Sequence, residues 1–198
     1  MNSRVRRWVR EGAILGLMIV GILAARSTLA DHYYVPSASM ENSLFGGDRV
    51  LVDKRAYGYR IPFTNIDVIA GTPVQRGDVV IFDSPRDGVR LIKRIVAVGG
   101  DHVVLSNGRL TLNGEQLALP ASPDVEVFNG KAVSLNLADG GGPPLDLRVP
   151  LGQVLAIGDH RGRSADSRVF GTVPEREIYG RAIAVYYRSG EGLSWIGL

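Results

Sequence analysis

The sequence predicts an all-β protein: a partly closed antiparallel β-barrel core with a smaller β insertion, preceded by an apolar N-terminal segment. After residue 33, short apolar runs with a period of two recur along the chain, and each ends at Gly, Asp, Asn or Pro. The 25 glycines fit a fold that is dense in turns. A length of 198 residues fits one domain with an insertion.

Six apolar runs predict the strands. They cover residues 49–61, 77–85, 89–101, 102–117, 152–159 and 179–188. Asn107-Gly108, between two apolar segments, predicts a two-residue hairpin turn, and Asn113-Gly114 repeats the signal. Residues 118–150 have weak periodicity and many Pro and Gly. We therefore assign residues 31–102 and 152–198 to the core and residues 103–151 to an inserted β subdomain.

The N-terminus combines a basic tail with an apolar segment. Residues 12–25 are uncharged, and as a helix they span about 21 Å, against about 30 Å of bilayer hydrocarbon. That length fits a cleaved signal peptide, with STLA at 27–30 as its cleavage site. A helix counted from Val9 to Ala30 spans about 33 Å and fits a membrane anchor equally well. Both interpretations place the tail, residues 1–11, in the cytoplasm.

Charge and composition argue against several classes of protein. Residues 1–11 hold four arginines and one glutamate, a net charge of +3 that equals the net charge of the whole chain. The remaining residues are neutral overall, so we expect no nucleic-acid partner. The chain has no cysteine, and His32, His102 and His160 do not have the spacing of zinc ligands. We expect no metal and no cofactor.

Two serines, Ser37 and Ser39, stand out in the segment VPSASM at 35–40. A serine becomes a good nucleophile only when a neighbouring base takes its proton. One candidate is His160, which follows Asp159 and permits a Ser-His-Asp arrangement. The other is Lys93, which on a strand would share a face with apolar residues and lose its charge through burial. A Lys-Arg pair at 93–94 is also compatible with ordinary solvated surface.

Five motifs in order resemble those of the type I signal peptidases, membrane-anchored serine proteases that remove signal peptides from exported proteins. The motifs are VPSASM (35–40), LVDKRAYG (51–58), RGDVVIF (76–82), IKRIVAVGGD (92–101) and GDHRGRSADSR (158–168). They cover most of residues 26–188 outside the insertion. The chain departs from the common family residues at Asn42, His160 and Gly162, none of which is an expected catalytic group.

The resemblance implies a role for each residue of these motifs. Ser39 would be the nucleophile, Lys93 the general base, and Ser37 an oxyanion donor beside the Ser39 N–H. Ser164 would orient the lysine. Structural support would come from Asp159, Asp166 and Arg168. Apolar residues flanking these groups are candidates for the substrate pocket: Val35, Pro36, Met40, Leu44, Leu91 and Ile92.

The resemblance also implies a location and partners. It favours an uncleaved single-pass anchor at 12–30, with the catalytic domain on the extracytoplasmic side of a bacterial plasma membrane. The expected partners are preproteins with signal peptides, the phospholipid membrane and the protein export machinery. The alternatives are an inactive or specialised membrane-tethered paralogue that binds signal peptides or processes few substrates, a processing protease of a conjugation system, and a secreted β domain.

Overall fold

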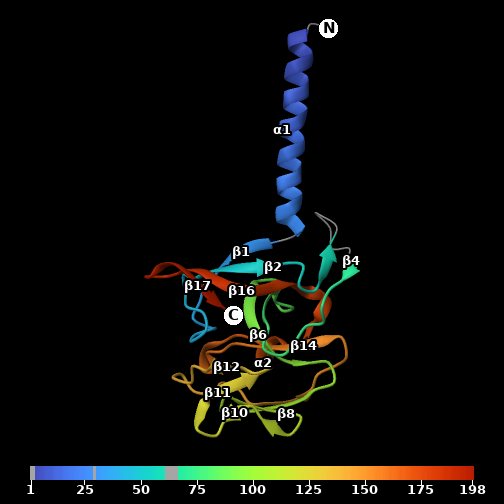
Figure 1. Ribbon diagram of the computed structural model, residues 1–198. Helices are drawn as coiled ribbons and strands as arrows, with labels where there is room; N and C mark the ends of the chain where they lie inside the picture. The colour runs from blue at the N-terminus through green and yellow to red at the C-terminus, as the bar shows by residue number, and fades with distance from the viewer. Residues whose placement is uncertain (1–2, 29, 61–66) are drawn as a thin grey trace.

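The computed structural model describes residues 3–28, 30–60 and 67–198 (Figure 1). A long helix, α1 (Ser3–Thr28), stands away from a domain built almost entirely of strands. The described residues of the domain form an eight-stranded main sheet and smaller sheets of four, three and two strands. The two-stranded sheet pairs β3 (Gly58–Arg60) with β4 (Asp67–Ala70).

The main sheet is antiparallel and has the order β1-β2-β16-β5-β6-β14-β15, with β17 also pairing with β16. Its strands are β1 (Ala30–Tyr34), β2 (Arg49–Asp53), β5 (Val79–Asp83), β6 (Arg90–Val98), β14 (Gln153–Ile157), β15 (Val173–Pro174), β16 (Ile178–Arg188) and β17 (Gly192–Gly197). Short helical turns η1 (Arg161–Arg163), α2 (Ser167–Phe170) and η2 (Glu175–Glu177) lie between β14 and β16. The central strand β6 places Lys93 opposite Val80 of β5 and Arg94 opposite Ile157 of β14.

The prediction of a partly closed barrel is wrong. Among the strands of the described residues, the end strands β1 and β15 each pair with one neighbour and not with each other. Closure would require a continuous ladder of hydrogen bonds between the two edges, and β15 offers only two residues. The sheet therefore stays open, and the strands between β6 and β14 form sheets of their own.

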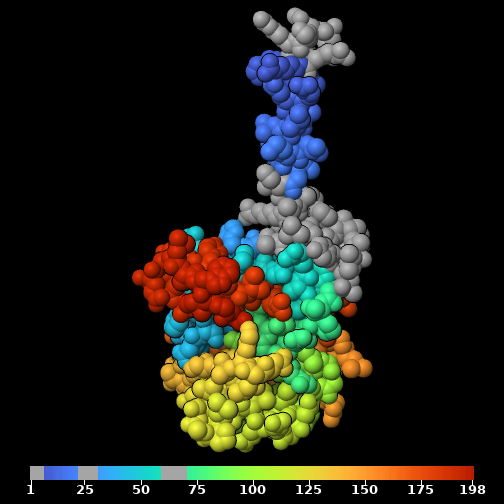
Figure 2. Space-filling view, viewed as in Figure 1, coloured from blue at the N-terminus to red at the C-terminus, as the bar shows by residue number. Residues whose placement is uncertain are grey.

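The strands between β6 and β14 form a lobe at the end of the domain opposite α1 (Figure 2). One sheet has the order β13-β7-β8-β9 and the other β10-β11-β12. Their bounds are β7 (His102–Ser106), β8 (Arg109–Leu112), β9 (Glu115–Gln116), β10 (Ala118–Leu119), β11 (Ser122–Phe128), β12 (Lys131–Ser134) and β13 (Leu145–Arg148). Buried residues of this lobe share one apolar cluster with Ala97 of β6 and Leu155 of β14. The lobe thus packs directly on the strand that carries Lys93.

Asn-Gly pairs make the hairpin turns of this lobe. Asn107 and Gly108 have positive φ angles of 50° and 78° between β7 and β8, as the sequence predicts. Asn129 and Gly130 make the same kind of turn between β11 and β12, which the sequence analysis did not single out.

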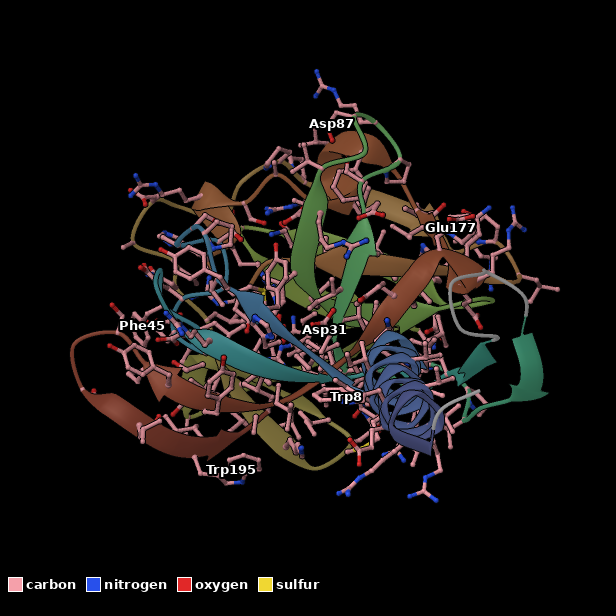
Figure 3. All side chains as sticks on the ribbon, turned by 90° about the horizontal axis from the view of Figure 1, so that it is seen from above. Trp8, Asp31, Phe45, Asp87, Glu177 and Trp195 are labelled. Carbon is pink, nitrogen blue, oxygen red and sulfur yellow. The ribbon has the colours of Figure 1, made fainter. Side chains whose placement is uncertain are left out.

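The prediction of a transmembrane helix over residues 12–30 is also wrong. No helix in the described parts of the chain is long and apolar enough to cross a membrane. Glu11 and Arg26 bracket the uncharged stretch, so its apolar length falls short of the hydrocarbon thickness. Viewed from above in Figure 3, α1 is seen along its axis, and Trp195 lies on the outer rim of the β16–β17 hairpin.

A buried ion pair joins the inserted lobe to the segment that follows β14. Arg161 Nη2 donates to Glu126 Oε2 of β11 at 2.6 Å, and neither side chain has measurable exposure. Arg161 also donates to the carbonyls of Gly158 and Gly108, while the Leu110 N–H donates to Glu126. Nothing in the sequence marked either residue, because a charge pattern does not identify which pairs become buried.

Replacing one partner of this pair should destabilise the domain strongly. Glu126→Ala leaves the Arg161 charge buried without its partner, and we expect a loss of about 3–5 kcal/mol in the free energy of unfolding. Asp124→Ala is the matched control, because it removes the exposed Arg109–Asp124 pair from the same strand and should cost less than about 1 kcal/mol. Urea unfolding of both variants measures the difference, and equal losses would contradict the structural role.

Candidate active site

The main feature of the site is a contact between β6 and the segment after β1. Lys93 Nζ lies 2.6 Å from Ser39 Oγ, and it also donates to the Ile92 carbonyl at 3.0 Å. Lys93 is 3% exposed and Ser39 7% exposed. The two residues predicted as base and nucleophile, 54 positions apart in sequence, are therefore hydrogen-bonded neighbours in a buried place.

The surroundings of Lys93 weaken its charge. With a period of two, Leu91, Lys93 and Ile95 share one face of β6, and the first and last of them pack in the cluster around Phe82. Burial lowers the pKa of Lys93 from 10.5 to about 8, although Asp166 and Asp159 act in the opposite direction by favouring the ammonium form. At pH 7 about one amine in ten is then neutral, against about one in 2,500 for a free lysine.

Ser39 is held by a compact turn whose apolar side chains anchor it. Val35, Met40 and Leu44 lie in a buried cluster with Ile92, and the Leu44 N–H donates to the Met40 carbonyl at 2.8 Å. Ser37 Oγ lies 3.3 Å from Ser39 Oγ. Both predicted serines therefore lie at the same point, on the side of the turn that meets β6.

Two buried arginine–carboxylate pairs surround this contact. Asp159 accepts from Arg94 Nε at 2.9 Å and Nη2 at 2.8 Å, and Ser43 Oγ donates to it at 2.6 Å. Asp166 accepts from Arg168 Nε at 2.8 Å and Nη2 at 2.7 Å. Asp166 also accepts the Gly158 N–H. The first pair joins β6 to the segment after β14, and the second pair connects residues within that segment.

Ser164 lies beside the contact but is not bonded to the lysine. Its Oγ is buried and makes no hydrogen bond within the described part of the chain. A Cβ at Gly158 would overlap both Ser164 Oγ and the Ser39 carbonyl, so glycine is needed for this close approach. The sequence analysis did not single out Gly158. The orienting role of Ser164 stays a prediction.

His160 does not form a triad with Asp159. The Asp159 carboxylate is occupied by Arg94 and Ser43, while the His160 ring lies against the Ala38 carbonyl, 3.3 Å from Nδ1. Lys93 therefore has the contact with Ser39 that a general base requires.

The six residues predicted for the substrate pocket separate by burial. Four of them are buried core residues close to Ser39 and Lys93: Val35, Met40, Leu44 and Ile92. Leu91 is half-buried and Pro36 is exposed. Their role in substrate binding stays a prediction. A cavity of about 800 Å³ lies nearby, between β12, β16 and β17, and it is lined by Asn42 and Ser43 but not by Ser39 or Lys93.

Comparisons with known proteins show the family to which the chain belongs. Residues 5–187 match the profile of the family described as signal peptidase, peptidase S26. A signal peptidase I of Pseudomonas fluorescens is 36% identical over 83% of this chain and 67% of its own length. The signal peptidase I of Pseudomonas aeruginosa is 34% identical, again over 83% of this chain and 67% of its own length. A probable signal peptidase I-2 of Synechocystis is 30% identical over 91% of this chain and 73% of its own length.

A solved signal peptidase I from Enterococcus faecalis V583 is 28% identical, covering 56% of this chain and 97% of that one. Its TM-score of 0.43 is too low for the two architectures to be compared. The profile match spans nearly the whole chain and includes Ser39 and Lys93. This chain belongs to the signal peptidase family, peptidase S26.

Proposed function

We propose that the chain is a serine endopeptidase that removes signal peptides from exported preproteins, with Ser39 as nucleophile and Lys93 as general base. The observation that carries this proposal is the 2.6 Å contact between Lys93 Nζ and Ser39 Oγ in a buried, apolar setting. A lysine can act as a base only in its neutral form, and burial supplies a substantial neutral fraction. Family membership gives the substrate class.

In the proposed reaction, Ser39 Oγ attacks the carbonyl carbon of the scissile peptide bond and its proton moves to Lys93 Nζ. The carbonyl oxygen becomes an oxyanion, which the Ser39 N–H and the Ser37 hydroxyl would stabilise. Lys93 then gives its proton to the leaving amine, and water, with Lys93 again as base, hydrolyses the acyl-enzyme. Neutral Lys93 can donate to the Ile92 carbonyl while its lone pair faces Ser39 Oγ.

We also propose that cleavage takes place at the outer face of a bacterial plasma membrane, beside the export machinery. Apolar side chains of α1, among them Leu15, Leu17 and Met18, are exposed to solvent in the isolated chain, which supports contact with lipid. Shallow pockets that exclude bulk would select small residues at the first and third positions before the cut. Lining by Pro36 and Leu91, which are not fully buried, fits that proposal best.

Loss of either dyad residue should abolish cleavage. Ser39→Ala removes the nucleophile and Lys93→Met removes the base, and we expect each to lower kcat by at least about 10⁴-fold. Ser106→Ala and Lys131→Met, at exposed positions of the inserted lobe, are the matched controls and should cut like the wild type. The measurement is mass spectrometry of a purified preprotein after incubation. Cleavage by Lys93→Met at the wild-type rate would exclude the lysine base, and an inactive wild type would favour a paralogue that only binds signal peptides.

The pH dependence of cleavage should report the titration of Lys93. Its pKa is about 8 and its neutral form is the active one, so kcat/KM should fall about tenfold per pH unit below about pH 7 and level off above about pH 9. Initial rates on a signal-peptide substrate between pH 5 and pH 10 would measure this. A flat profile across that range would contradict the proposed base.

The same lysine should lower the stability of the fold at neutral pH. Because the folded pKa of about 8 lies below the 10.5 of an unburied lysine, the unfolded chain binds more protons between these values. The stability of the wild type therefore rises with pH in this range. Lys93→Met should be more stable than the wild type at pH 7 by up to about 3 kcal/mol. The difference should shrink as the pH approaches 10.5. Urea unfolding at pH 7 and pH 10 tests this, and a difference that does not change with pH would contradict it.

A further inference from the structure

His160 is a buried histidine that the proposed reaction does not use. It is 3% exposed and follows Asp159 in the segment after β14. Its N–H donates to the Ser39 carbonyl at 3.2 Å, and it forms a parallel bridge with Asn136 of the loop after β12. His160 therefore lies between the inserted lobe and the turn that carries Ser39 (residues 35–44, here called the serine turn), and it contacts both.

Among the described residues, hydrogen-bond acceptors face both nitrogens of the His160 ring. Nδ1 lies 3.3 Å from the Ala38 carbonyl oxygen and 3.4 Å from Glu41 Oε2. Nε2 lies 2.9 Å from Asp139 Oδ2, although the angle of approach does not make a hydrogen bond. A carbonyl oxygen can only accept, so the Ala38 oxygen is bonded when the ring hydrogen is on Nδ1. Nδ1–H is then a donor to the Ala38 carbonyl.

That carbonyl belongs to the peptide unit whose N–H is that of Ser39. A trans peptide is planar, and its C=O and N–H point in opposite directions. The Ala38 oxygen accepts from the Glu41 N–H at 3.1 Å and faces His160 Nδ1 at 3.3 Å, and bonds that fix this oxygen also fix the direction of the Ser39 N–H. No backbone or side-chain acceptor takes the Ser39 N–H within the described residues, so this donor is available to a substrate.

We propose that His160 is a positioning residue of the oxyanion hole: its Nδ1–H holds the Ala38 carbonyl and so directs the Ser39 N–H at the substrate oxyanion. Asp139 of the inserted lobe faces the other ring nitrogen, and the backbone bridge between His160 and Asn136 ties the residue to that lobe. This inference rests on the proposed function. The proposal gives the inserted lobe an indirect part in catalysis through its contacts with His160. His160 itself touches neither the substrate nor the reacting atoms.

Substituting asparagine or glutamine at position 160 distinguishes the contribution of Nδ1 from that of Nε2. The Asn amide nitrogen can occupy the place of Nδ1 and donate to the Ala38 carbonyl, whereas the longer Gln side chain reaches the place of Nε2 near Asp139. We would compare His160→Asn, His160→Gln and His160→Ala with the wild type. His102→Asn is the matched control, since that ring is exposed and bonded to Asp146.

Four quantities are measured for each variant. These are kcat and KM on a signal-peptide substrate, the thermal midpoint, and the affinity for a peptide aldehyde. Ser39 Oγ adds to the aldehyde carbon, the serine proton moves to Lys93, and the aldehyde oxygen becomes an oxyanion in the hole. Aldehyde affinity therefore reports the hole itself, which a purely structural role of His160 would not affect selectively.

We expect His160→Ala and His160→Gln to lower kcat and aldehyde affinity together by about 10- to 100-fold, with KM within about twofold of the wild type. His160→Asn should stay within about threefold of the wild type in all three constants. Equal kcat values in the Asn and Gln variants, or an unchanged aldehyde affinity in His160→Ala, would overturn the inference. Ser39-dependent cleavage by the wild type shows separately whether the proposed function holds.

Discussion

The site depends on keeping one lysine out of water. In the proposed reaction Lys93 takes a proton from Ser39, which requires a penalty on its charged form. That penalty exists because β6 is covered on both faces by packed apolar clusters. The same burial forces the neighbouring carboxylates to find partners, so Asp159 and Asp166 are each held by an arginine. The proposed chemistry of Ser39 and Lys93 therefore depends on the packing of the sheet around the lysine.

The inserted lobe contributes to this arrangement from outside the main sheet. It covers β6 and β14, and Glu126 holds Arg161 in the segment that also carries Ser164 and Asp166. Three polypeptide segments then meet at Ser39: the serine turn, β6 and the segment after β14. Each is held by buried polar contacts as well as by apolar packing, which is why the geometry is well defined although much of it lies in loops.

Several elements could be predicted from the sequence for clear physical reasons. Period-two runs and Asn-Gly turns report local backbone preference, so the strands of β5–β8 and the first two hairpins agree with prediction. The two wrong predictions have different causes. Barrel closure depends on which strand edges meet, which no local pattern reports. The transmembrane prediction depended on apolar length, which Glu11 and Arg26 limit. Residue patterns brought Ser39 and Lys93 forward together, but not Gly158, Glu126 or the contact of His160 with Ala38. Those depend on tertiary approach, which no local pattern encodes.

The place where the lobe leaves the main sheet has a consequence for how such a chain can diverge. Val98 pairs with Val154, and the Gly100 N–H donates to the Val149 carbonyl, so the excursion starts and ends at one point. Residues can be added or lost within it without shifting the register of β6. In the β5–β6 hairpin, by contrast, a slip of one residue would turn Lys93 to the opposite face. Length variation in relatives should therefore accumulate in the lobe, at loop tips away from Glu126 and Asp139, and spare the short hairpin.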